Sequence, residues 1–191
     1  MDVFDLLDRE TRRFSRDFHD CAAQPDDSGR HAAGEPLLRR IATYLLALED
    51  VIYPSLVAAE IGIPPSALQA HERLRRRTAE ALLRYCGREA SAYRSLCRVR
   101  HDLKQYVELM RRELYPAMYR TLSVAESLLL ADELLQWLAA HRRQQDGGMA
   151  TPPARPWAPS RPPGLDLDRL PTLHHVVAQA QAGLRGPGRP R

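Results

Sequence analysis

Apolar residues recur at helical spacing through most of the first 143 residues. In the opening segment, the shared face consists of Phe4, Leu7, Thr11, Phe14 and Phe18. Between about residues 35 and 60, a second face consists of Leu37, Ile41, Tyr44, Leu48 and Val51. Stripes spaced three and four residues apart are typical of amphipathic helices that bury one face. The pattern predicts an all-α protein.

Proline and glycine divide this region into separate helices. We expect a loop over residues 22–35 and a break at Pro64 and Pro65, because proline lacks the amide donor that a helix interior needs. A third helix then runs to about residue 85, and a fourth covers about residues 91–119.

A fifth helix is expected to begin after Ser123. Glu126 stands three residues later, which is the spacing of a capping box, where both side chains bond backbone amides of the first turn. Four long amphipathic helices with short connections favour an antiparallel four-helix bundle, here with an added C-terminal helix.

The composition changes near residue 144. The last 48 residues hold 9 of the 15 prolines and 6 of the 10 glycines. We therefore expect a helical bundle over residues 1–143, a disordered Pro/Gly-rich linker over 144–164, and a basic tail over 165–191. The tail contains a short amphipathic helix, with an apolar stripe that is a candidate docking site for a partner protein: Leu173, Val176, Val177 and Leu184.

Charge is unevenly shared between the two parts. The whole chain has a net charge of +4; residues 1–143 carry 22 basic and 21 acidic residues, and residues 144–191 carry six and three. The end of the tail faintly resembles an AT-hook, although Pro187 interrupts the motif. A disordered basic end is the simpler interpretation, so nucleic acid is not an expected partner; the candidate contacts are Arg185, Arg189 and Arg191.

Several classes of protein are not favoured. No run approaches ~18 uninterrupted apolar residues, and the start lacks an apolar signal segment, so we expect a cytoplasmic protein without a membrane partner. The cysteines Cys21, Cys86 and Cys97 lack metal-ligand spacing, which suits reduced thiols. The chain has no Gly-rich phosphate loop or recognisable catalytic triad, so an enzyme is not the favoured interpretation.

Two segments 62 residues apart repeat one pattern. Residues 44–54 (YLLALEDVIYP) and 106–116 (YVELMRRELYP) both read Tyr-x3-(Leu/Met)-x3-(Ile/Leu)-Tyr-Pro. Together with the opening Asp2-Val-Phe-Asp-Leu-Leu and the later Leu-Ser-x-x-Glu, they resemble the hemerythrin-like (HHE cation-binding) family in order and spacing. The resemblance covers about residues 1–141 and implies a pseudo-twofold four-helix bundle.

Members of that family hold a di-iron centre inside the bundle, with His from each helix and Glu from the second and fourth. The resemblance implies that the ligand positions of the first, second and fourth helices are occupied, in chain order, by Thr11, Tyr44, Leu48, Tyr106 and Met110. The third-helix position falls on Arg75, or on His71 if the register shifts by one turn. Leu and Met cannot replace a carboxylate that bridges hard iron. We therefore expect no metal and no cofactor, with iron bound near His71 as the alternative.

The two core tyrosines have two interpretations. Tyr44 and Tyr106 fill the volume that the metal would occupy, with their hydroxyls bonded to each other or to Thr11 or Thr78. Alternatively, they and His71 line a site for a metal or a small ligand.

Charged side chains of the helices also have two interpretations. Arg75 in the core would need a carboxylate partner, for which Asp102 and Glu113 are candidates, because an unpaired buried charge is costly. Alternatively, it belongs to a solvated face with the neighbouring arginines Arg73, Arg76 and Arg77. Surface charge is the favoured interpretation of the acidic residues Glu49, Asp50, Glu108 and Glu113.

The sequence thus predicts a hemerythrin-like bundle without a normal di-iron site. We expect it to be a non-catalytic binding, regulatory or scaffold module with a protein partner. The alternative is a divergent sensor of metal, oxygen, redox state or a small ligand that uses the bundle core.

Overall fold

The computed structural model describes the backbone of residues 1–145 and the side chains of residues 1–141. The first two residues of the linker expected over 144–164 are helical, and the rest of it lies outside the described residues. Also outside them are the tail positions singled out above: Leu173, Val176, Val177, Leu184, Arg185, Arg189 and Arg191.

The described part of the chain is all-α, with five long helical stretches and no strands, as the periodicity predicts. Helix α1 (Val3–Ala22) and helix α2 (Asp27–Ala47) form one hairpin. Helix α4 (Pro65–Cys86) and helix α5 (Ala92–Leu109) form a second.

Two of the stretches are composite. Helix α2 continues through a π-helical turn, η1 (Leu48–Ile52), into α3 (Tyr53–Ala58). Helix α5 continues through a second π-helical turn, η2 (Met110–Leu114), into α6 (Tyr115–Thr121). The last stretch is α7 (Val124–Gln145).

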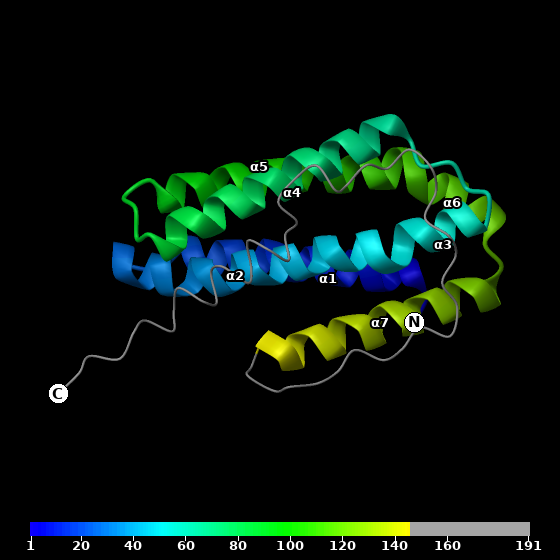
Figure 1. Cartoon of the computed structure of the whole chain (residues 1–191), viewed down its shortest axis with the longest axis horizontal. Coiled ribbons are helices and arrows are strands. Elements are labelled where there is room, and N and C mark those ends of the chain that lie inside the picture. Colours follow the sequence, from blue (N-terminus) through cyan, green and yellow to red (C-terminus); the bar gives the residue numbers. More distant parts are fainter. Residues whose placement is uncertain (146–191) are drawn as a thin grey trace, which may run out of the picture.

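The two hairpins lie lengthwise beside each other, and α7 lies on the outside against α1 and α2 (Figure 1). Apolar faces of all five stretches meet in one continuous core. The expected face of α1 is part of it, since Phe4, Leu7, Phe14 and Phe18 are buried together with Thr11. Burial of these stripes is the main source of helix stability, because isolated helices of this length are marginal in water.

The start of α2 differs from the expectation. A loop was expected to reach residue 35, but the helix begins at Asp27, where the Asp26 carboxylate accepts a hydrogen bond from the Gly29 amide. Pro36 lies inside the helix and removes one donor from the carbonyl of Ala32. Both residues are exposed, so water can satisfy that carbonyl and the helix continues through the proline.

The other expected boundaries agree closely with the structure. Helix α4 ends one residue beyond the expected position. The capping box before α7 is confirmed, because the Glu126 carboxylate accepts from the Ser123 amide at 2.8 Å and the Ser123 hydroxyl accepts from the Glu126 amide at 3.2 Å.

The repeated Tyr-Pro pairs explain the two π-helical turns. The amides of Tyr53 and Tyr115 bond carbonyls five residues earlier, at Leu48 and Met110. Each is followed by a proline, whose ring would clash with the carbonyl four residues before it in a regular α-helix. One extra residue in the turn removes this clash, and such turns are frequent at functional sites. The sequence repeat is therefore also a repeat of local structure.

One helical stretch of the described chain, Asp27–Ala58, is long and apolar enough to cross a membrane by length and composition alone. Its most apolar window has a mean hydropathy of 1.4, and 61% of that window is buried inside the structure. Packing against α1, α4, α5 and α7 accounts for this apolar character, because the stretch lies at the centre of the fold.

Candidate functional site

The positions implied as ligand positions gather in the core at the level of the two π-helical turns. Thr11, Tyr44, Leu48, Tyr106 and Met110 are all buried. So are His71 and Arg75, which stand one turn apart on α4. The two registers considered for this helix are therefore not exclusive, since both side chains face the interior.

A chain of hydrogen bonds crosses this region, and we name it the Tyr–His–Glu chain: Tyr106, Tyr53, His71 and Glu49. The hydroxyl oxygens of Tyr106 and Tyr53 are 2.8 Å apart, and the Tyr53 oxygen is 3.1 Å from His71 Nδ1. On the other side of the ring, Nε2 is 2.8 Å from Glu49 Oε1. The chain therefore connects α5, α3, α4 and η1.

The donors and acceptors of the chain are consistent with one direction. Burial raises the pKa of Tyr53 and that of Tyr106 well above the ordinary value, so both hydroxyls keep their protons. The bond between them lowers the pKa of Tyr53 and raises that of Tyr106, as expected when Tyr106 donates. Tyr53 then donates to Nδ1 of His71, and Nε2–H donates to the Glu49 carboxylate.

Arg75 extends the polar cluster beyond Glu49. Its guanidinium lies 3.8 Å from Glu49 Oε1 and bonds the carboxylate oxygens of Glu72 at 2.9 and 3.2 Å. These partners differ from the expected ones, because Asp102 pairs with Arg77 and Glu113 pairs with Arg112. The interpretation of Arg75 as part of a solvated face is wrong.

The neighbouring arginines do remain accessible. The side chain of Arg75 is 5% exposed, against 42% for Arg73 and 37% for Arg77. Arg76 is also exposed. A solvated arginine face therefore exists on α4 without Arg75.

Two members of the Tyr–His–Glu chain, Glu49 and Tyr53, were not predicted from the sequence. Glu49 was interpreted as surface charge, yet its side chain is only 12% exposed. Glu108, by contrast, is 64% exposed, as expected. Tyr53 was seen only as part of the repeat. The spacing of Glu49 and Tyr53 could have predicted their burial. They are four residues apart and therefore share one helix face, which is directed to the core that also contains Tyr44.

Tyr44 lies beside the Tyr–His–Glu chain. Its ring packs edge-on against Phe14 at a centroid distance of 5.4 Å. Burial is the main cause that raises its pKa well above the ordinary value. The hydroxyl of Tyr106 bonds Tyr53, which was not among the partners expected for it.

The residues present do not fit a di-iron centre. Both ring nitrogens of His71 already have hydrogen-bond partners, so neither nitrogen is free to bind a metal. The apolar side chains Leu48 and Met110 occupy the places implied for bridging carboxylates. Within the described part of the chain, no three His, Cys, Asp or Glu side chains form a group that could hold a metal ion.

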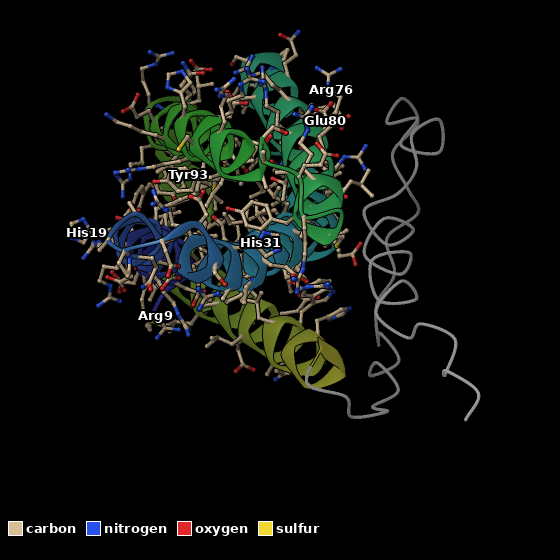
Figure 2. All side chains as sticks on the ribbon, turned by 90° about the vertical axis from the view of Figure 1, so that its left-hand side faces the viewer. Arg9, His19, His31, Arg76, Glu80 and Tyr93 are labelled. Atoms are coloured by element: carbon tan, nitrogen blue, oxygen red, sulfur yellow. The ribbon has the colours of Figure 1, made fainter. Side chains whose placement is uncertain are left out.

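A cavity of about 680 Å³ opens at one end of the bundle, away from the Tyr–His–Glu chain. Its lining includes His31 on α2, Tyr93 on α5, and Tyr85 and Arg88 near the α4–α5 turn. Figure 2 looks onto this end and shows His31 and Tyr93 near the junction of the two hairpins. None of the four residues of the Tyr–His–Glu chain contributes to the lining of the cavity, so the core cluster and the cavity are separate features.

Comparison with known proteins finds no relative of this chain. No family model matches the chain, and neither a curated protein nor a solved structure matches it.

Proposed function

We propose that the chain is a hemerythrin-like bundle whose core holds a hydrogen-bonded polar cluster in place of a di-iron centre. In this proposal it acts in the cytoplasm as a non-catalytic binding, regulatory or scaffold module. The observation that carries the proposal is the hydrogen bonding of His71, the one histidine among the described residues that lies near the implied ligand positions. Both of its nitrogens are engaged by neighbouring side chains.

The repeated π-helical turns support the family assignment within this proposal. They begin at Leu48 and Met110, the two positions implied for the bridging carboxylates. A pseudo-twofold bundle with matched distortions suits a site that once had two similar halves. The hydrogen-bonded cluster draws on both halves but is not itself repeated, since Glu49 has Arg111 as its counterpart in the repeat, and Arg111 turns outward to Asp8 at 2.8 Å.

The non-catalytic assignment follows from the burial and saturation of the cluster. Tyr53, His71 and Tyr106 are less than 7% exposed, and their polar atoms bond one another. A general acid or base must reach a proton of its substrate directly or through one water. A ring enclosed by two tyrosines and a glutamate offers no such path, so the outer surface is the place for partners.

Iron content is the first test. Purified full-length protein, and protein incubated anaerobically with excess ferrous iron and then desalted, should contain well below one iron per chain. The reason is that iron would have to break the hydrogen bonds of His71, and that the side chains of Leu48 and Met110 offer no oxygen ligand. The measurement is elemental analysis together with the visible absorption spectrum.

About two irons per chain, with new absorption bands, would overturn the proposal and favour the alternative, a metal or oxygen sensor. Copper or zinc added in the same way serves as a control for adventitious binding by exposed cysteines. Metal that is lost after alkylation of the exposed thiols Cys86 and Cys97 does not count as core binding.

A further inference from the structure

The two hairpins carry opposite charge. Residues 1–64 contain 7 basic and 12 acidic residues, a net charge of −5, whereas residues 65–121 contain 13 basic and 6 acidic residues, a net charge of +7. In Figure 2 the α4–α5 hairpin lies on one side of the molecule and the α1–α2 hairpin on the other. The near-neutral total of the body therefore conceals a strongly basic face.

The positive charge is concentrated where α4 and α5 meet at the surface. Arg73 and Arg77 of α4 both approach the single carboxylate of Asp102 on α5, at 3.8 and 2.9 Å. Arg84 donates to the Ser91 hydroxyl at 3.3 Å, so this helix face is directed toward α5 along its length. These contacts fix which side of each helix borders the junction.

Helix α5 adds two arginines on the same side. Arg94, Arg98 and Asp102 are four residues apart, so they form one row on the helix surface. Arg94 and Arg98 are exposed, and neither forms an ion pair within the described residues. We name this row of five arginines the basic seam: Arg73, Arg77, Arg84, Arg94 and Arg98.

The spacing of the basic seam suits a phosphate backbone. From Arg73 to Arg84 the helix rises about 16 Å. One strand of duplex nucleic acid presents a phosphate about every 3.4 Å along the axis, or about five over this length. Asp102 and the exposed Glu80, which stands between Arg77 and Arg84 on the same side of α4, each compensate one guanidinium, so about three positive charges remain for about five phosphates.

The surroundings of the basic seam favour this occupant over others. The one large apolar side chain exposed on α4 or α5 is Leu83, which borders the end cavity, so the seam lacks the aromatic or apolar anchors typical of protein interfaces. Membrane-surface helices insert an apolar face, but the apolar faces of α4 and α5 are buried in the core.

We propose that the basic seam binds the phosphodiester backbone of duplex nucleic acid without reading its sequence. The inference rests on the proposed function as a binding module and names one partner for it. It does not involve the core cluster, so a failed iron test leaves it standing, and failed nucleic-acid binding leaves the metal-free assignment standing. The contacts are bidentate arginine–phosphate hydrogen bonds, which make the affinity strongly dependent on salt.

Fluorescence anisotropy with full-length protein and labelled 20-base-pair duplexes tests the proposal. We expect micromolar binding at low salt, equal within about threefold for two unrelated sequences. With about three phosphate contacts, raising the salt from 50 to 200 mM should weaken binding roughly fortyfold. The double substitution Arg94→Gln/Arg98→Gln should weaken binding at least tenfold and reduce the slope of log affinity against log salt by about two.

A matched control uses Arg12→Gln/Arg16→Gln on α1, which has the same spacing and the same change of charge on the acidic hairpin. This variant should bind the duplex within about twofold of the unmodified protein. Circular dichroism of both variants should show unchanged unfolding temperatures, because all four side chains are exposed.

Equal loss in the control would mean that net charge alone is responsible and would overturn the proposal. So would unchanged binding by Arg94→Gln/Arg98→Gln. A loss found instead in Arg185→Gln/Arg189→Gln/Arg191→Gln would assign the contact to the tail. Preference for polyglutamate or for anionic phospholipid vesicles over the duplex would replace nucleic acid by an acidic protein segment or a membrane.

Discussion

At the residue scale, the central feature is a histidine held between a tyrosine and a glutamate. In the direction assigned above, His71 accepts from Tyr53 and donates to Glu49, while Tyr106 donates to Tyr53. Each buried polar atom in this order has a partner, which removes most of the penalty for placing it in the core. The arrangement is therefore sensitive to the loss of a single hydroxyl.

Removing the middle hydroxyl should cost more than removing the terminal one. Tyr53→Phe leaves the Tyr106 hydroxyl and His71 Nδ1 without partners, which predicts a loss of about 1–3 kcal/mol in the free energy of unfolding. Tyr106→Phe leaves only one lone pair of Tyr53 without a donor and should cost less. Urea denaturation followed by circular dichroism measures both changes.

The control for this series is Tyr119→Phe. Tyr119 is 60% exposed, and its ring stacks on that of Phe4 with 3.6 Å between the ring centroids. It keeps the ring and loses a hydroxyl that water already satisfies, so the free energy of unfolding should change by less than about 0.5 kcal/mol. Equal costs for all three variants would contradict the hydrogen-bonded chain described above.

Sequence reasoning located most of this site but not its connections. The family resemblance implied core positions for Tyr44 and Tyr106, with His71 as the alternative to Arg75, and the structure finds all four buried. Glu49 was missed because a carboxylate is exposed by default, and its burial depends on a histidine that α4 brings from 22 residues away. Such a pairing requires the packing of several helices, which periodicity does not contain.

At the element scale, α2 depends on a close approach to α4. Gly34 is buried, and a Cβ built there would lie 2.6 Å from the Cε1 and Cζ atoms of Tyr85. Tyr85 is itself 1% exposed, and its hydroxyl lacks a hydrogen-bond partner. The glycine therefore sets how closely the two helices pack at this end of the bundle.

Gly34→Ala should destabilise the fold despite the higher helix propensity of alanine. The overpacking penalty is about 1–3 kcal/mol, against a propensity gain of at most about 1 kcal/mol. A second substitution, Tyr85→Leu, shortens the side chain, so the pair should be less destabilised than the sum of the single variants. Thermal unfolding of the four proteins in this cycle gives the coupling.

Gly62→Ala provides the comparison, because a Cβ there has no neighbour within 4 Å. Its unfolding temperature should equal or slightly exceed that of the unmodified protein. Additive effects in the cycle would mean that Gly34 and Tyr85 do not restrict each other.

Element boundaries were predictable where the local chemistry is strong. Ser123 and Glu126 identified the start of α7 from sequence, because a capping box needs only neighbouring residues. The start of α2 was placed too late, because the prolines and glycines near Pro36 suggested a loop. The burial of Gly34 against Tyr85 shows that tertiary packing overrides that local preference.

At the scale of the whole molecule, charge was the least predictable property. A net charge of +4 directed attention to the tail, whereas the larger separation lies between two hairpins of the folded part. Opposite charges cancel in the sum over residues 1–143, and only the pairing of helices shows that they occupy different sides. The composition of the whole chain cannot reveal such a separation of charge.

Stability of the whole fold should fall at alkaline pH. Burial raises the folded-state pKa of Tyr44, Tyr53 and Tyr106, while in the unfolded chain each ionises near pH 10. The stabilisation is therefore fully present below about pH 10 and is lost as pH rises above it, because the unfolded state releases protons that the folded state retains.

Parallel titrations of phenolate absorbance and of helical circular dichroism measure this dependence. We expect the last of the seven tyrosines to ionise only as the helical signal disappears. Complete ionisation with an intact helical signal would show that the core hydroxyls are open to solvent.

The two π-helical turns also determine where the chain tolerates changes in length. Each contains one residue more than a regular α-helix needs, and that extra residue keeps the following proline away from the carbonyl four residues before it. Deleting one residue within Leu48–Ile52 or Met110–Leu114 would restore a regular α-helical turn, and the ring of Pro54 or Pro116 would then clash with that carbonyl. In an evolving lineage, insertions and deletions should therefore accumulate in the interhelical loops, while the two turns keep a constant length.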